Sequence, residues 1–383
     1  MGAILFLFSD TGGGHRSAAE AIIEAIGLEF GEGIVCKMVD VFRDYAPRPL
    51  NWVPDLYPEM VRVPQLWGFG WRLSDGRRRA RLLQAGAWPY IHRSIRRLVR
   101  QHPADLIVSV HPLSNAPVLR ALGEQRAPFV TVVTDLVSTH MFWYDRRVDL
   151  CLVPTQEAGQ RALQAGLRRE QVKVVGLPVA ERFCQALGEA HELRARLNWP
   201  QERPVVLLVG GAEGMGPLEQ TAQALAEADL PITLVVIAGR NAALKQRLEA
   251  QSWPMPVLVY GFVREMPEMM RAADILLTKA GPGTISEALI AGLPMILYSH
   301  LPGQEEGNIA YVAGNGAGVW APQREQVVEA VRAWVNDPAK HRQARRACLQ
   351  LARPNAARVT AHLLVEQMAQ GRGEGKASKA ARS

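Results

Sequence analysis

His15 follows three consecutive glycines and opens an alanine-rich stretch with a helical pattern. The stretch is FSDTGGGHRSAAEAI, residues 8–22, and it continues the apolar run Ala3–Phe8. Glycines let a ligand approach the backbone closely, and a helix N-terminus offers unpaired N–H groups. The positive end of the helix dipole lowers the pKa of a histidine, which keeps the ring neutral and able to accept a proton. This order of residues predicts a ligand site with His15 as general base.

Neither common nucleotide loop fits this glycine turn completely. No GK[ST] follows, which excludes a Walker A loop, and Ser17 stands where G-x-G-x-x-G needs its last glycine. Asp40 ends the second expected strand, so a dinucleotide site stays open on this motif alone. A capping or packing role for His15 also stays open.

Two further turns follow expected strands in the second half. VVLLVGGAEGMGP, residues 205–217, is a second glycine-rich turn and contains Gly211, Ala212 and Glu213. VLVYGFVREM, residues 257–266, places Phe262 and Val263 just after a strand end. Backbone groups there suit the edge of a base, with Phe262 packed near it; the alternative is that Phe262 belongs to the core.

The stretch LLTKAGPGTISEALIAGLPMILYSHLPGQEEGN, residues 276–308, is the most specific. Gly283 lies in a tight turn, and Thr284 with Glu287 three residues later has the spacing of a capping box. The functional alternative for Glu287 is a carboxylate that accepts two hydrogen bonds from a ribose diol.

A polar cluster follows the next expected strand of this stretch. Gln304, Glu305 and Asn308 come after that strand, at the sheet edge where open α/β sheets bind ligands. Such amide and carboxylate groups suit sugar hydroxyls.

Short apolar runs that alternate with helical patterns must position these residues. Continuous apolar runs of this length are typical of buried parallel strands, so we expect an α/β protein with two tandem βαβ-type sheets. The domain boundary is expected between Gly176 and Pro204. The expected strands are 3–8, 34–42, 105–110, 129–134, 149–153, 172–175, 205–209, 233–237, 257–260, 275–278 and 295–298.

The window 43–100 interrupts this alternation of expected strands and helices. It contains twelve arginines, four acidic residues and four tryptophans, Trp67 and Trp71 among them, in a chain of net charge +7. Its first part is too rich in proline for a long helix, and its second part reads as one or two basic amphipathic helices. Tryptophan and arginine in such an insertion favour an anionic membrane surface. A solvated helix face stays open; no RNP motif or zinc knuckle supports nucleic-acid binding.

Taken together, four stretches resemble glycosyltransferase family 28, most closely the monogalactosyldiacylglycerol synthases and the processive diacylglycerol glucosyltransferases. They are SDTGGGHRSAAEAI, VVTDLVSTHMFWY, TKAGPGTISEALIAGLPMI and GQEEGN. The resemblance covers roughly residues 3–365 and extends more loosely to the peptidoglycan N-acetylglucosaminyltransferases.

This resemblance implies a GT-B fold, in which two Rossmann-like domains face each other across a cleft. The expected domains are an N-terminal acceptor domain, 1–178, and a C-terminal UDP-sugar domain, 179–370, with a last helix that packs back on the first domain. The tail 371–383 is polar and basic, and we expect it to be disordered.

The resemblance also implies inverting transfer of galactose, or glucose, from a UDP-sugar to the hydroxyl of 1,2-diacylglycerol. His15 is the expected base, with Asp10 or Asp135 to orient it. Helix N-termini at 211–213 and 283–284 are expected to meet the diphosphate.

Other residues are assigned to the two substrates, and no resident cofactor or metal is expected. Arg182 is the nearest match to an arginine that related enzymes place after a Gly-x-Pro turn. The expected donor-binding residues are Gly211, Ala212, Glu213, Phe262, Val263, Gly283, Thr284, Glu287, Gln304, Glu305 and Asn308. The expected acceptor-binding residues are Gly13, Gly14, His140, Trp67 and Trp71.

The expected partners are a UDP-sugar, diacylglycerol and an anionic membrane, with no nucleic acid. Four widely spaced cysteines without a CxxC pair, and no stretch long enough to span a bilayer, favour a peripheral enzyme on the cytoplasmic face of a membrane. Three alternatives stay open: a polyprenyl-linked peptidoglycan precursor as acceptor, a non-catalytic nucleotide or lipid binder, and an NAD-dependent oxidoreductase.

Overall fold

The chain forms two compact units in the computed structural model, which describes residues 2–11, 13–61, 63–124, 126–214 and 216–380. Unit 1 contains Met1–Glu181, Leu301–Gln304 and Asn355–Ser383. Unit 2 contains Arg182–His300 and Glu305–Pro354. The chain therefore first leaves unit 1 after Glu181, close to the boundary expected after residue 178.

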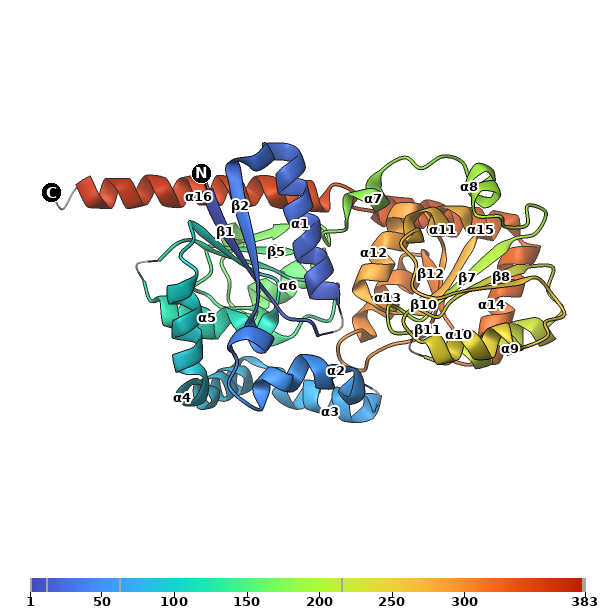
Figure 1. The fold of residues 1–383 in the computed structure, drawn as a ribbon, viewed down its shortest axis with the longest axis horizontal. Coiled ribbons are helices and arrows are strands. Elements are labelled where there is room, and N and C mark those ends of the chain that lie inside the picture. Colours follow the sequence, from blue (N-terminus) through green and yellow to red (C-terminus); the bar gives the residue numbers. More distant parts are fainter. Residues whose placement is uncertain (1, 12, 62, 125, 215, 381–383) are drawn as a thin grey trace. The chain divides into compact units, whose positions relative to one another are not determined.

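Unit 1 is built on a parallel six-stranded sheet with the order β2-β1-β3-β4-β5-β6 (Figure 1). Its strands are β1 Gly2–Phe8, β2 Ile34–Asp40, β3 Leu106–Ser109, β4 Phe129–Val132, β5 Leu150–Val153 and β6 Val172–Val174. The helices α1 Gly14–Phe30, α5 Asn115–Leu122 and α6 Gln156–Gln164 join strands of this sheet. Strands β3, β4 and β5 are buried along their whole length, as continuous apolar runs predict for strands covered on both faces.

The last helix, α16 Ala356–Ala380, completes the core of unit 1. Its residues Ala357, Ala361, Leu364 and Met368 recur at helical spacing and pack with Ile4 and its neighbours in one buried cluster. Figure 1 shows this red helix beside α1. Helix α16, the last helix of the chain, therefore belongs to unit 1.

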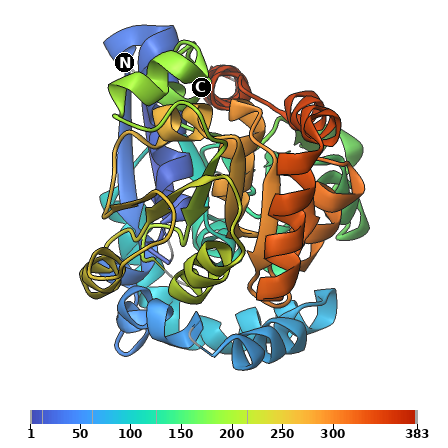
Figure 2. The ribbon, with the colours of Figure 1, turned by 90° about the vertical axis from the view of Figure 1, so that its right-hand side faces the viewer.

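The basic insertion forms helices between β2 and β3. After a π-helical turn, Val41–Tyr45, and a 3-10 turn, Leu50–Trp52, come α2 Val53–Val61, α3 Pro64–Ser74 and α4 Arg77–Gln101. Prolines limit the first part to two short helices, and α4 continues through Pro89. In both views of unit 1, α2 and α3 lie below the strands (Figures 1 and 2).

Unit 2 has its own parallel six-stranded sheet, with the order β12-β11-β10-β7-β8-β9. Its strands are β7 Val205–Val209, β8 Thr233–Ile237, β9 Val257–Tyr260, β10 Ile275–Lys279, β11 Met295–Ser299 and β12 Gly318–Trp320. Its helices are α8 Ala190–Arg196, α9 Leu218–Glu227, α10 Ala242–Glu249, α11 Met266–Ala272, α12 Pro282–Ala291, α13 Glu306–Gly314, α14 Arg324–Asn336 and α15 Pro338–Leu351, and the short α7 Glu181–Cys184 lies at the unit boundary.

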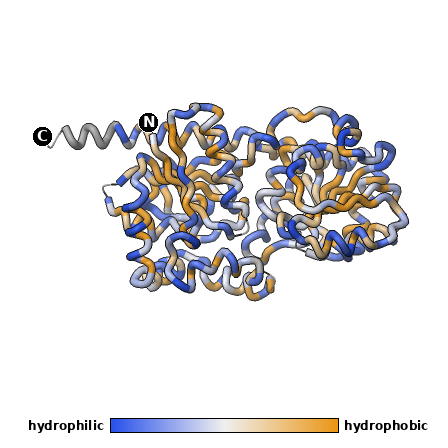
Figure 3. Tube along the Cα trace, in the orientation of Figure 1, coloured by the Kyte–Doolittle hydropathy of each residue, from blue (hydrophilic) through white to orange (hydrophobic). Residues whose placement is uncertain are grey.

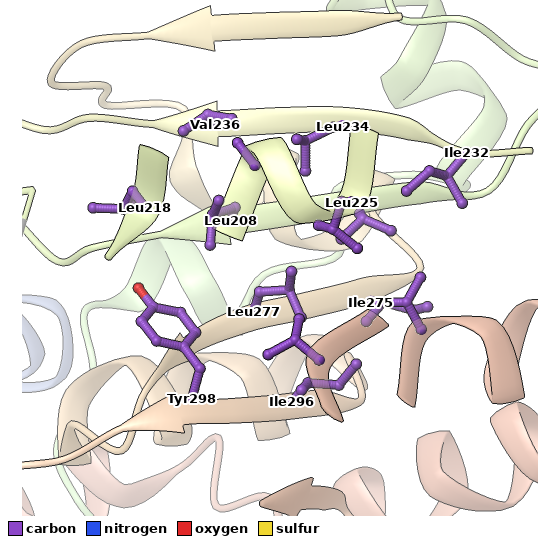
Figure 4. Close-up of a cluster of buried hydrophobic side chains, with 14 of the residues drawn as sticks. Leu208, Leu218, Leu225, Ile232, Leu234, Val236, Ile275, Leu277, Ile296 and Tyr298 are labelled. Carbon is purple, nitrogen blue, oxygen red and sulfur yellow. The ribbon is translucent and has the colours of Figure 1, made fainter. Parts of the chain in front are cut away.

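Aliphatic side chains from strands and helices fill the core of unit 2. Leu208 and Leu277 from the sheet pack with Leu218 and Leu225 of α9 (Figure 4). Tyr298 lies at the edge of this cluster, where its buried hydroxyl donates a 3.1 Å hydrogen bond to the carbonyl of Val209. Figure 3 shows strands of both sheets as hydrophobic traces, in agreement with the buried runs in the sequence.

The eleven expected strands are all present, with ends that shift by at most a few residues. The sequence missed β12, which has only three residues. Helix α16 continues to Ala380 through residues that we expected to be disordered; residues 381–383 lie outside the described part. Within the described residues, none of the helices has the length and apolar character needed to cross a membrane.

Candidate active site

The carboxyl ends of three neighbouring strands bring the expected base and its partners together in unit 1. His15 follows β1, Thr134 and Asp135 follow β4, and His111 follows β3, which lies between those strands. Because all strands run parallel, residues that follow them meet at one edge of the sheet. We call His15, Thr134, His111, Asp135 and Trp143 the base site.

His15 lies in the first turn of α1 and is held from the side by Thr134. Its Nδ1 lies 2.8 Å from the Thr134 hydroxyl oxygen. Trp143, the last residue of a 3-10 turn, places its ring 6.0 Å from the His15 ring, centroid to centroid. These contacts fix the imidazole orientation, as the role of a general base requires.

Burial lowers the pKa of His15 to about 4, although an interaction with the Val110 backbone raises it. The side chain is half-buried, so solvent or a ligand still reaches it. The ring is therefore neutral at physiological pH and able to accept a proton.

His111 is a member of the base site that sequence reasoning missed. Its ring meets His15 edge to face at 4.7 Å, and its Nε2 lies 3.3 Å from the Thr11 hydroxyl oxygen. The side chain is buried, and its Nδ1 has no hydrogen-bond partner within the described residues. Burial, and secondarily the charge of His15, lower the pKa of His111 well below its usual range. The available signal was its position two residues after a buried strand.

Asp10 does not orient His15 in the manner expected. Its two carboxylate oxygens accept hydrogen bonds of 2.6 Å from Nε and Nη2 of Arg16, and this pairing lowers the pKa of Asp10. The Arg16 guanidinium also lies over the Phe8 ring at 4.5 Å. A bidentate pair is the stronger interaction for a carboxylate, so Asp10 stabilises the turn that carries His15.

Asp135 is engaged by two side chains other than His15. Its Oδ2 accepts a 2.7 Å hydrogen bond from Nε1 of Trp143, and its Oδ1 accepts one of 3.0 Å from Gln304. Gln304, expected on the donor side, belongs to unit 1. Asp135 thus contacts Trp143, whose ring lies beside His15, while Thr134, one residue earlier, makes the direct contact with His15 that the sequence did not predict.

The two described glycines of the turn before His15 have open space beside them. Gly13 has a φ of +78° and caps α1, and Gly14 is its first residue, whereas Gly12 lies outside the described part. A Cβ added at either described glycine would meet no atom within 4 Å. Their predicted role in acceptor binding remains a prediction, and this open approach is compatible with it.

His140 and the two insertion tryptophans form a ring cluster in unit 1. The rings of Trp71 and His140 meet edge to face, with their centroids 4.9 Å apart. The ring centroids of Trp67 and Trp71 are 6.4 Å apart. The His140 Nε2 lies 3.1 Å from the hydroxyl of Ser74, at the end of α3. His140 therefore fastens the insertion to the segment that carries Asp135 and Trp143.

In unit 2, the expected donor residues again follow carboxyl ends of strands. Gly211, Gly214 and Gly216 all have positive φ, and α9 begins only at Leu218. The prediction of a helix N-terminus at 211–213 is therefore wrong. Gly283 and Thr284 do lie in the first turn of a helix, α12.

Arg240 links two of the expected donor segments. Its Nη1 donates a 2.6 Å hydrogen bond to Glu213, its backbone N–H donates to the Ala212 carbonyl at 2.8 Å, and its guanidinium lies 4.8 Å from the Phe262 ring centre. Phe262 is 57% exposed, so the alternative that placed it in the core is wrong. The sequence signal for Arg240 was its place just after β8, behind Gly239.

Helix α12 begins earlier than the capping-box interpretation requires. Pro282 occupies its first turn and Gly281 is the N-cap, so Thr284 is already inside the helix and does not cap it. The described residues offer Glu287 no hydrogen-bond partner. Burial raises the pKa of Glu287 to about 7, and the charge of Arg182 lowers it. The charge of Arg182 is thus felt at Glu287, and the predicted role of Glu287 in donor binding remains a prediction.

A buried ion pair supports the polar cluster after β11. Nζ of Lys279 lies 2.6 Å from Oε1 of Glu305, which is only 2% exposed. Asn308 donates a 2.8 Å hydrogen bond to the Ala280 carbonyl, and its buried Oδ1 has no partner within the described residues. Lys279, the last residue of β10, was not predicted. We call Arg182, the segments at Gly211–Glu213, Phe262–Val263 and Gly283–Glu287, and the Lys279, Glu305 and Asn308 cluster the donor site.

The two sites offer complementary chemistry. The base site holds a neutral imidazole on an open turn, and the donor site holds helix N–H groups, an arginine and unpaired oxygens. Across the described ranges, no three His, Cys, Asp or Glu side chains group so as to hold a metal ion.

Comparison with known families gives matches to both halves of the chain. Residues 15–179 match the monogalactosyldiacylglycerol (MGDG) synthase family, and residues 205–360 match the glycosyltransferase family 28 C-terminal domain. A probable monogalactosyldiacylglycerol synthase 2 of Oryza sativa subsp. japonica is 40% identical over 92% of this chain and 78% of its own length. Monogalactosyldiacylglycerol synthase 1 of Arabidopsis thaliana is 39% identical over 92% of this chain and 68% of its own length.

Solved structures with similar folds include two of low sequence identity. The Acinetobacter baumannii MurG structure covers 96% of this chain and all of its own, with a TM-score of 0.64 and 16% identity. The S. aureus MnaA–UDP structure covers 93% of this chain and 94% of its own, with a TM-score of 0.59 and 12% identity. With the two parallel sheets, these likenesses confirm the predicted GT-B fold.

Proposed function

Because this chain belongs to the monogalactosyldiacylglycerol synthase family of glycosyltransferases, we propose that it transfers galactose from UDP-galactose to the free hydroxyl of 1,2-diacylglycerol. The product is a β-galactosyldiacylglycerol, since the transfer inverts the configuration at the anomeric carbon. UDP-sugar and diacylglycerol are co-substrates, and no resident cofactor enters the reaction.

The observation that carries this proposal is the neutral His15 on its open glycine turn. Thr134 holds Nδ1, so we assign Nε2 as the atom that takes the proton from the diacylglycerol hydroxyl. As that oxygen forms its bond to the anomeric carbon, the bond from this carbon to the UDP oxygen breaks and UDP leaves. A positioned general base typically contributes about 10²–10⁴-fold to the rate.

The donor site is suited to the leaving UDP. Glu287, whose pKa burial raises to about 7, accepts hydrogen bonds from the ribose diol. The N–H groups at Gly283 and Thr284 and the charge of Arg182 face the negative charge that grows on the diphosphate. Phe262 packs beside the nucleotide base of UDP. Asn308 offers its unpaired Oδ1 to a sugar hydroxyl.

Helices α2 and α3 supply the contact with the membrane in this proposal. Their exposed side chains include Leu66 at 67% and Phe69 at 65%, both on α3. The stretch from α2 to the end of α3 also exposes Leu56, Met60, Val63 and Leu73. Helix α4 adds a run of arginines. An apolar surface beside arginines favours peripheral binding to an anionic bilayer.

The reaction is tested by incubating the protein with diacylglycerol in mixed vesicles and labelled UDP-galactose or UDP-glucose. We expect one labelled glycolipid with UDP-galactose, and β stereochemistry at the new bond. Product from UDP-glucose alone would overturn the assigned sugar. No glycolipid from either donor, with UDP still bound, would overturn diacylglycerol as acceptor.

A further inference from the structure

A cavity of about 350 Å³ opens in unit 1 between α4, α5 and the segment around Asp145. Its wall from α4 includes Arg77, Arg81 and Trp88, which lie along one stripe of the helix. No residue of the ring cluster, the glycine turn or the base site lines this cavity, although Met141, next to His140, does. The cavity is therefore separate from the groups that the proposed reaction uses.

The lining is strongly positive. Five arginines, Arg77, Arg81, Arg120, Arg146 and Arg147, face one acidic residue, Asp145. Asp145 is already bound to Arg147, through hydrogen bonds of 2.9 Å and 2.6 Å. Across the described residues, the other four arginines have no carboxylate within ion-pair distance. Four charges in this cavity thus lack a counterion among the described residues.

Two of these arginines lie beside each other. A Cβ added at Gly166 would come within 2.4 Å of Nη2 of Arg146 and 2.8 Å of Nη2 of Arg77. Both guanidinium groups therefore lie next to the same glycine, whose φ of +95° and lack of a side chain leave room for them. Like charges this close repel each other, and an anion held between them removes the repulsion.

Another arginine of the lining, Arg120, has a fixed orientation. The Arg120 guanidinium lies 4.5 Å from the centre of the Trp88 ring, which holds its plane against the aromatic face. Planar guanidinium groups bind phosphate oxygens through paired hydrogen bonds. The cavity therefore combines charge with oriented donors, which distinguishes it from a scattered basic surface.

We propose that this cavity is a binding site for a phosphate monoester dianion, distinct from the donor site. Two charges on one phosphate match the adjacent Arg77 and Arg146, and the remaining volume admits a glycerol-sized substituent. The same chemistry is offered by a soluble phosphate ester and by the head group of phosphatidic acid. A lipid phosphate would make the cavity a membrane anchor, and a soluble one would make it a metabolite sensor.

The site can be tested without relying on transferase activity. Calorimetry with saturating UDP present measures the binding of inorganic phosphate and of glycerol 3-phosphate. Saturating UDP keeps phosphate out of the donor site. We expect Arg146→Gln and Arg77→Gln each to weaken phosphate binding at least tenfold. Arg78→Gln is the matched control, because Arg78 is exposed on the same helix and does not line the cavity.

Vesicle binding separates the two sources of phosphate. Phosphatidylcholine vesicles that contain phosphatidic acid are compared with phosphatidylserine vesicles of equal surface potential. If the protein binds phosphatidic acid vesicles more tightly and Arg146→Gln abolishes this preference, the result supports the site and identifies its ligand as a lipid. Binding of the soluble esters alone, lost in Arg146→Gln, supports the site and assigns it to metabolites. Equal losses in Arg146→Gln and Arg78→Gln, or no binding in either arm, would overturn the proposal.

Discussion

The His15 Nδ1 lies 2.8 Å from the hydroxyl oxygen of Thr134, a residue 119 positions further along the chain. This contact takes the place that a carboxylate holds in many acid–base pairs. Asp10 is bound to Arg16 and Asp135 to Trp143, so neither is the direct partner of the ring. The hydroxyl can orient His15 without adding a charge that would raise its pKa.

Replacing Thr134 by Val should therefore lower kcat about fivefold, because one hydrogen bond of about 1 kcal/mol no longer fixes the proton on Nδ1. The KM for the UDP-sugar should not change, since Thr134 belongs to the base site. Thr134→Ser, which keeps the hydroxyl, should retain most of the activity. Steady-state kinetics of both variants checks this, and wild-type turnover in Thr134→Val would refute the role of the contact.

Stability of unit 1 should fall as the pH falls from about 6.5 to 4. The folded-state pKa of His15 is lowered to about 4 from 6.5, so the unfolded chain takes up a proton first within this window. The difference contributes up to about 3 kcal/mol in favour of unfolding at the acid end, and nothing above the unfolded pKa. His111 acts in the same direction.

Chemical denaturation between pH 4 and pH 7 measures this slope. The double variant His15→Gln, His111→Gln should show a flatter dependence on pH than the wild type. An unchanged slope in the double variant would mean that other groups cause the acid sensitivity.

Glu287 should show the opposite trade-off in unit 2. Its pKa is raised from 4.5 to about 7, so the unfolded chain releases this proton first as the pH rises through that window. The carboxylate therefore costs up to about 3 kcal/mol of stability above pH 7. Glu287→Gln should raise the melting temperature at pH 8 and weaken UDP binding about tenfold. A variant that binds UDP like the wild type would remove Glu287 from the donor site.

Membrane binding should depend on the exposed apolar residues of α3. Phe69→Asp places a charge on a side chain that is 65% exposed, so folding should be unaffected while partition into anionic vesicles falls at least tenfold. Leu28→Asp is the control, because Leu28 is 58% exposed on α1, away from the insertion. Vesicle co-sedimentation measures both. Equal partition of the two variants would place the membrane contact elsewhere.

Local patterns predicted the strands and the glycine turns well. A buried parallel strand is a continuous apolar run, so its position is visible in the sequence, and residues that follow it reach the ligand edge. β12 was not predicted because a strand of three residues is too short to show a distinct apolar run in the sequence. The capping box at Thr284 was wrong because Pro282 favours a first-turn position, so α12 starts at Pro282 and Gly281 is its N-cap.

The partners of the site residues were not predictable in the same way. Thr134, His111 and Arg240 act through contacts with segments far away in the chain, and no spacing rule connects such residues. The pairing of Asp135 with Trp143 depends equally on how the 3-10 turn at 141–143 folds. Sequence reasoning identified the edge of the sheet, and the packing of side chains decided which groups touch there.

The most direct test of the account is the rate of galactosyldiacylglycerol formation by His15→Ala at saturating UDP-galactose. His191→Ala is the matched control, because His191 is exposed on α8 and contacts neither site. We predict a loss of about 10²–10⁴-fold for His15→Ala with unchanged UDP binding, and wild-type activity for His191→Ala. Turnover of His15→Ala within about threefold of the wild type would contradict the assignment of His15 as the base.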